Sequence, residues 1–277
     1  MAKPFILLRI LSLLAVGAVG VAAPSLAQGD NLSQREHEIM VAWSEFVAEQ
    51  DGTLFEVPAF SGRIPQEAIA RKARSEALLN RRGVPVLDSL PVIETAAQSR
   101  RLTSRAVAER ALALMVVTIK ADTRDNALAR DVMAAYGAEA YLTPQEREYV
   151  FSTAATEDDH LQNVWRYEAL NTLLWALGYT DTFGHPDTIS DIDWIAEELL
   201  ELGPEGIFTQ ARLRSQSELL DQADLIYRYH WAAIEAREGA RAMPAGVDPS
   251  IILERHYTLN WLIGYLDQAW DDISTDT

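Results

Sequence analysis

The sequence predicts an all-α protein, a compact multi-helix, bundle-like domain of about eight or nine helices with little or no sheet. Two observations support this prediction. Apolar side chains recur with the helical period through most of the chain. Residues that begin or end helices stand at the boundaries of these segments. Only Thr53 to Phe60 has the composition of a strand, and this stretch is short.

The first 27 residues have the form of a secretory signal peptide. A basic start precedes an apolar run from Ile10 to Ala23, and small residues lead to an expected cleavage between Ala27 and Gln28. The alternative is an uncleaved N-terminal anchor. We therefore expect an exported protein, periplasmic or secreted, that keeps no stable membrane span after cleavage.

The helices expected before residue 140 divide the chain into an extension and a domain. Residues 28–63 form a partly helical N-terminal extension, and residues 64–277 form the all-α domain. The expected helices cover Ser33 to Glu49, Pro65 to Arg81, Thr95 to Ala121, and Arg124 to Tyr136.

The later helices carry clearer start and stop signals. Thr143 to Glu146 is a capping box with proline at the first helical position. Three of the later expected helices end at glycine, namely at Gly178, at the pair Gly203-Pro204 and at Gly239. The expected helices run from Thr143 to about Ala155, from about His160 to Leu177, from Ser190 to Leu202, from about Gln216 to Glu238, and from Asp248 to about Asp267.

Composition narrows the possible partners. The formal net charge is −17, so phosphate backbones and anionic membranes are repelled, and we expect no nucleic-acid partner. Cysteine is absent, which excludes thiol catalysis, disulfides and cysteine–zinc sites. We expect no cofactor and no bound metal. The remaining partners are an unknown protein or a small-molecule ligand, and the oligomeric state stays open.

Three segments of the second half place charges on apolar helix faces, where an unpaired charge is costly. Glu168 falls among tryptophans, and Arg255 and Glu254 fall on two apolar faces of the last helix. Glu168 is a plausible partner for Arg255, since arginine suits a buried carboxylate pair. Arg166 is expected to extend outward to solvent. The other possible partners of Arg255 are Asp271, Asp272 and Asp276.

The helix from Gln216 separates an apolar face from a charged row. His230 lies near the centre of the apolar face, as a hydrogen-bonded core histidine or as a ligand or general base. Glu218, Asp221 and Arg228 line up on the opposite side, which predicts a solvated row of ion pairs.

These segments resemble the bacterial family described as domain of unknown function 4272. The words that carry the resemblance include ARSEALLNRRGVPVLDSLPVIE (Ala73 to Glu94), WRYEALNTLLWALG (Trp165 to Gly178), LRSQSELLDQADLIYRYHWAA (Leu213 to Ala233) and ERHYTLNWL (Glu254 to Leu262). The resemblance covers most of the chain expected after cleavage of the signal peptide, and Gln28 to Arg63 lie outside it. It implies no activity, so no catalytic residue is carried over from it.

Two hypotheses for function follow. The first is a binding or interaction module with a buried network of tryptophans and charges, because no phosphate loop, zinc helix or nucleophile turn is present. The second is a small-molecule hydrolase or related enzyme with Glu168 or Glu254 as acid or base and with His230 and Arg255 in support. Metal assistance through His230 and His256 is a weaker variant. The candidate binding residues are Arg228, Trp231, Trp261, Asp271 and Asp272.

Overall fold

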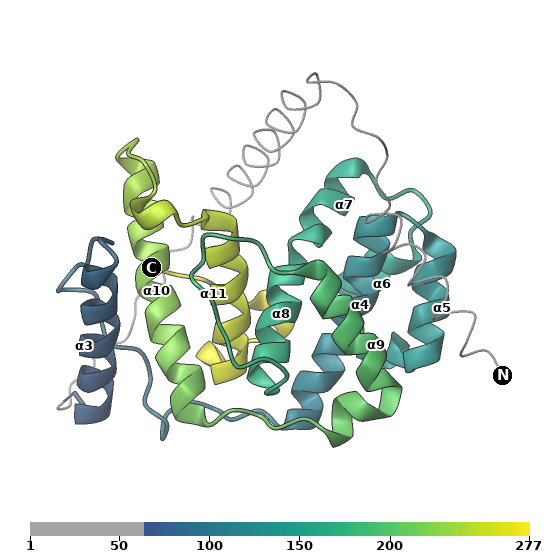
Figure 1. Cartoon of the computed structure of the whole chain (residues 1–277), viewed down its shortest axis with the longest axis horizontal. Helices are drawn as coiled ribbons and strands as arrows, with labels where there is room; N and C mark the ends of the chain where they lie inside the picture. Colours follow the sequence, from purple (N-terminus) through teal and green to yellow (C-terminus); the bar gives the residue numbers. More distant parts are fainter. Residues whose placement is uncertain (1–63) are drawn as a thin grey trace.

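A computed structural model describes residues 64–277 of the chain, and Figure 1 shows their arrangement. These residues form α-helices joined by turns and short 3₁₀ segments, with no strand among them, which confirms the all-α prediction. The predicted signal peptide, the helix expected over Ser33 to Glu49 and the strand-like stretch Thr53 to Phe60 lie outside the described residues.

The helices follow one another closely along the chain. The α-helices are α3 (Gln66–Arg81), α4 (Ser104–Thr123), α5 (Asn126–Tyr136), α6 (Pro144–Phe151), α7 (Glu157–Val164), α8 (Arg166–Ala176), α9 (Ile192–Thr209), α10 (Gln216–Glu238) and α11 (Pro249–Ile263). The 3₁₀ segments are η1 (Ala138–Tyr141), η2 (Pro244–Gly246), η3 (Tyr265–Asp267) and η4 (Trp270–Asp272).

Helix α4 is the centre of one half of the molecule. It packs against α5, α6, α7, α8 and α9, and most of its side chains are buried. Beyond α8, the helices α11, α10 and α3 follow side by side (Figure 1). A helix buried nearly all round, such as α4, is typical of the interior of a bundle.

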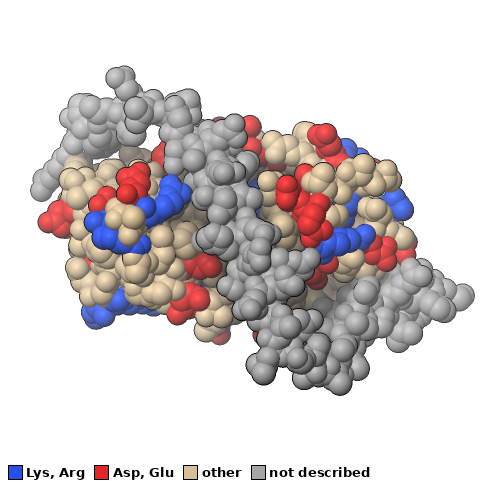
Figure 2. Space-filling view, turned by 90° about the horizontal axis from the view of Figure 1, so that it is seen from above, with Lys and Arg blue, Asp and Glu red and all other residues tan. Residues whose placement is uncertain are grey.

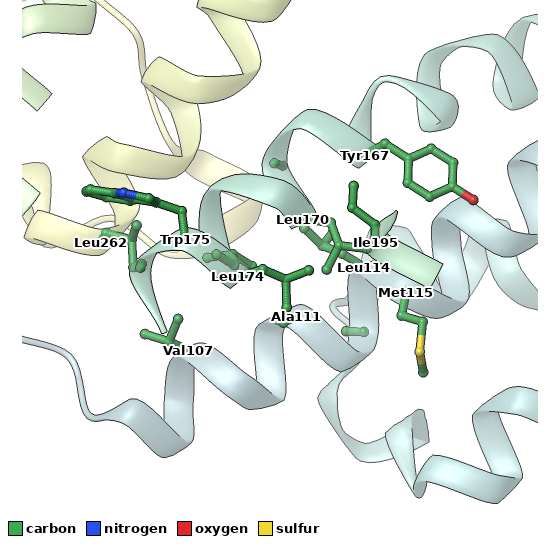
Figure 3. Close-up of a cluster of buried hydrophobic side chains, with 14 of the residues drawn as sticks. Val107, Ala111, Leu114, Met115, Tyr167, Leu170, Leu174, Trp175, Ile195 and Leu262 are labelled. Carbon is green, nitrogen blue, oxygen red and sulfur yellow. The ribbon is translucent and has the colours of Figure 1, made fainter. Parts of the chain in front are cut away.

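One layer of the apolar core lies between α4 and α8 (Figure 3). Burying one large aliphatic side chain contributes about 1.5–3 kcal/mol relative to leaving it exposed, so this layer is a main source of stability. Fully buried side chains in it include Val107, Ala111 and Leu114 from α4, and Leu170 and Leu174 from α8.

Predicted capping chemistry sets the start of α6. Thr143 and Glu146 form both hydrogen bonds of the capping box. The helix ends at Phe151, before the predicted Ala155. There the Lys120 Nζ atom of α4 donates to the carbonyl oxygens of Tyr149 and Ser152 at 2.6 Å each, which satisfies acceptors at the helix end.

Two predicted helices differ in extent. The helix predicted from Thr95 begins at Ser104, because the Thr103 hydroxyl accepts from Ala106 N at 3.1 Å and caps it there. The helix predicted over residues 160–177 is two helices, α7 and α8, that meet at Trp165. The Glu168 N–H bonds to the Trp165 carbonyl, three residues back rather than four, which restarts the ladder.

Glycines account for two further differences. The stop predicted at Gly203 is a kink with φ of 61°, after which helical structure continues to Thr209. Helix α11 ends at Ile263 rather than near Asp267, because Gly264 adopts φ of 72°. A Cβ atom at Gly264 would meet the Arg100 Cβ atom at 2.7 Å, so this helix end also needs the space that glycine leaves.

Acidic and basic side chains occur in small mixed groups on the face shown in Figure 2. Ion pairs such as Arg147–Glu139 (3.0 Å) and Arg124–Glu157 belong to this kind of exposed pairing. No helix within residues 64–277 is both long enough and apolar enough to cross a membrane.

Candidate functional site

The start of α8 and the middle of α11 bring four charged side chains together. Glu168 on α8 accepts from Arg255 on α11, with 3.3 Å between Oε2 and Nε, so the predicted pair is confirmed. Arg166, two residues earlier on α8, donates through Nη1 to Glu254 Oε2 at 3.1 Å. The order of the two charges is therefore opposite on the two helices.

The Glu168–Arg255 pair is buried and its polar atoms are occupied. Glu168 Oε1 accepts from the Ser190 backbone N–H, and Arg255 Nη1 donates to Gly184 O at 2.7 Å. The Arg255 guanidinium also lies over the Phe183 ring, 4.8 Å from its centre. Burial lowers the pKa of Arg255 and Glu168 opposes this shift, so the guanidinium depends on its carboxylate partner.

The Glu254–Arg166 pair corrects the expectation that Arg166 extends to solvent. The Glu254 side chain is 1% exposed and the Arg166 side chain 26% exposed, and Arg166 also lies over the Tyr257 ring at 4.8 Å. Burial raises the pKa of the Glu254 carboxyl, while Arg166 lowers it. Arg166 turns inward because α11 packs on α8 and presents a carboxylate there.

His230 is buried on the apolar face of α10, as the sequence indicated. Its Nδ1 atom lies 2.8 Å from Nδ1 of His256 on α11, and the rings meet edge to face at 82°. A hydrogen bond at this distance needs one ring to donate and the other to accept, and burial, which lowers the pKa of both rings, favours their neutral forms. Burial lowers the pKa of His230 to about 4. The described residues contain no group of three or more His, Cys, Asp or Glu suited to a metal ion.

Arg228 corrects the expected surface row on α10. Its guanidinium forms a bidentate pair with Asp224, at 3.0 and 2.8 Å, and both side chains are almost fully buried. Helix α3 packs on this side of α10 and covers them; its Arg71 donates to Asp221 at 3.1 Å. Glu218 stays at the surface. The sequence analysis did not identify Asp224 as the partner of Arg228, although a spacing of four residues on one helix is a usable signal for such a pair.

Of the remaining candidates, Trp261 and Asp271 take part in the contacts of the C-terminal tail. Trp261 packs edge to face on Trp270 with ring centres 5.2 Å apart, and the Tyr257 hydroxyl donates to Trp270 O. Asp271 accepts from Gln145 N at 3.5 Å, and Asp272 is exposed. Neither aspartate pairs with Arg255. Trp231 is half-buried against the core.

A separate cavity lies among α4, α5, α8 and α9. Its volume is about 320 Å³. Its wall is mainly aliphatic and also includes Thr118, Asp122, Tyr136 and Tyr167. None of Glu168, His230, Glu254 and Arg255 lines it. Sequence reasoning missed this cavity, because a space between four helices has no signature in any one segment.

The chain belongs to the family described as "Domain of unknown function (DUF4272)", whose model matches residues 71–273. The matched region begins in α3 and ends after the docked tail residue Trp270, so it contains both ion pairs, the histidine pair and the cavity. Comparisons with curated proteins and with solved structures found no match.

Proposed function

We propose that this protein is an exported all-α binding or interaction module, in which the buried charges of α8 and α11 hold helices together. One observation supports this proposal. The groups that an enzyme would use, Glu168, Glu254, Arg255 and His230, each bind another group of the protein, and none lines the cavity. Export is inferred from the form of residues 1–27.

Removing one charge of the Glu168–Arg255 pair tests the structural role. Glu168→Gln and Arg255→Met should each lower the free energy of unfolding by about 3–5 kcal/mol, because each leaves a buried charge unpaired. The double variant should recover part of that loss, since no unpaired charge remains. Urea denaturation followed by circular dichroism measures all three.

The exposed pair Glu139–Arg147 supplies the control. Glu139→Gln should change the free energy of unfolding by less than about 1 kcal/mol. Unchanged or increased stability in Glu168→Gln would contradict the proposal, because groups kept for activity are often held at a cost to stability.

The raised pKa of Glu254 is the observation that favours the alternative, a small-molecule hydrolase. Under that alternative, Glu254→Gln abolishes turnover that the folded wild-type protein performs on ester or amide substrates. Under the binding proposal, the wild-type protein has no such turnover.

A further inference from the structure

The cavity among α4, α5, α8 and α9 is partly open to solvent, and the exposed Asp122 stands in its wall. A volume of about 320 Å³ falls at the lower end of small-molecule sites, which span about 300–1,000 Å³. The fold therefore maintains a space that a small ligand could fill.

We propose that this cavity binds an alkylammonium-type ligand, with an apolar body in the cavity and a cationic group held by Asp122. This inference rests on the binding function proposed above and specifies its ligand class.

The wall suits an apolar body. Figure 3 shows Met115, Tyr167, Leu170 and Ile195 gathered at one end of the core cluster, and all four line the cavity. Aliphatic side chains from three helices make up most of the remaining surface, including Ile119, Leu128 and Leu199. Burying the apolar body of a ligand here would add hydrophobic stabilisation and van der Waals contacts that the wall residues lack in the empty cavity.

Three of the four hydroxyl groups of the wall, all except that of Tyr167, already donate to helix carbonyls. Thr118 donates to Leu114 O at 2.9 Å, Thr123 donates to Ile119 O at 2.7 Å, and Tyr136 donates to Leu199 O at 3.0 Å. A ligand that needs hydrogen-bond donors, such as a carboxylate or phosphate, therefore finds these three already used by helix carbonyls.

Asp122 gives the site its charge preference. No group within residues 64–277 donates a hydrogen bond to its carboxylate, and Asp122 is an exposed residue that lines the cavity. The neighbouring cation, Arg124, is held by Glu157, with 3.2 Å between Nε and Oε2. Desolvation raises the pKa of Asp122, the charge of Arg124 lowers it in part, and the charge of Asp193 raises it again, so that the pKa remains raised. A ligand cation beside the carboxylate would offset both raising effects through its opposite charge, while an anion would be repelled.

Calorimetric titration of the full chain with n-octylamine, which is cationic at pH 7, tests the proposal. Octan-1-ol and octanoate are the neutral and anionic matches of the same chain length. Octylammonium should bind at least tenfold more tightly than octan-1-ol, and octanoate should bind least. Ala196→Phe, which adds a ring to the cavity wall, should abolish binding of all three.

Asp122→Asn should weaken octylammonium binding at least tenfold and leave octan-1-ol binding unchanged. Asp88→Asn also removes one negative charge, but from the loop after α3, away from the cavity. It should change the binding of neither octylammonium nor octan-1-ol. Equal binding of octylammonium and octan-1-ol, or no binding by the folded wild-type protein, would overturn the proposal. Those results would leave the unfolding test of the Glu168–Arg255 pair unaffected, so failures of the two proposals can be told apart.

Discussion

The core contains buried polar side chains that are paired as neutral groups as well as buried ion pairs. His230 and His256 meet in a space where an imidazolium would be desolvated, and both pKa values are lowered by burial. The position of His230 on an apolar face could be predicted from helical spacing. Its hydrogen bond to His256 could not, because that contact depends on how α10 and α11 approach each other.

The histidine pair should make the fold sensitive to acid. The folded pKa of His230 is about 4, below its ordinary value of 6.5, so the unfolded chain takes up a proton first as the pH falls. The stabilising effect is complete above about pH 6.5 and is lost as the pH falls towards 4. From pH 7 to pH 5 the loss should be on the order of 2 kcal/mol.

Urea denaturation at a series of pH values measures this loss. His230→Gln keeps hydrogen-bonding groups near His256 but removes one titrating ring, so its stability should fall less steeply with acid than that of the wild-type protein. Identical slopes in the two proteins would show that the pair does not cause the acid sensitivity.

At the scale of single helices, the sequence was informative where the determinant is local. The capping box at Thr143 was predicted, and α10 occupies its predicted range of Gln216 to Glu238. Local signals were insufficient at Trp165, where no glycine or proline marks the break between α7 and α8. They also could not reveal Lys120, which caps α6 from a different helix.

Lys120 should therefore be important for the end of α6. Its side chain is buried and donates to three carbonyl oxygens, those of Tyr149, Val150 and Ser152. Lys120→Met should lower the free energy of unfolding by about 3 kcal/mol, because buried acceptors lose their donor. Thermal and urea unfolding would measure the loss.

Lys72 provides a matched control, because it also donates to backbone carbonyls, those of Asp88 and Leu90, but is 18% exposed. Water can replace it, so Lys72→Met should cost less than Lys120→Met. Equal losses would argue against a special role for the buried lysine.

At the scale of the whole molecule, contacts between distant segments decide which charges are buried. Arg166 and Arg228 were expected at the surface, and both are drawn inward because another helix covers them. The Glu168–Arg255 pair was predictable, since both side chains fall on apolar faces and have opposite charge. The cavity and the role of Asp122 depend on four helices at once, and no single segment could indicate them.

The C-terminal tail contributes to this long-range organisation. Trp270 is buried against Tyr257 and Trp261, and the Arg110 guanidinium lies 5.0 Å from its ring centre. Trp270→Ala should lower the free energy of unfolding by about 3–5 kcal/mol, measured by urea denaturation. The half-buried Trp231 is the comparison, and Trp231→Ala should cost less. A negligible loss in Trp270→Ala would mean that the tail is not an integral part of the fold.

The reversed order of charges on α8 and α11 has a consequence for how the chain avoids misfolding. If one helix slid or turned against the other so that Arg166 met Arg255, or Glu168 met Glu254, like charges would face each other without water. Apolar faces alone would tolerate several such alignments. The Arg166–Glu254 and Glu168–Arg255 pairs raise the free energy of these alternative alignments. Their contribution therefore lies as much in the helix packings that they disfavour as in the stability of the native fold.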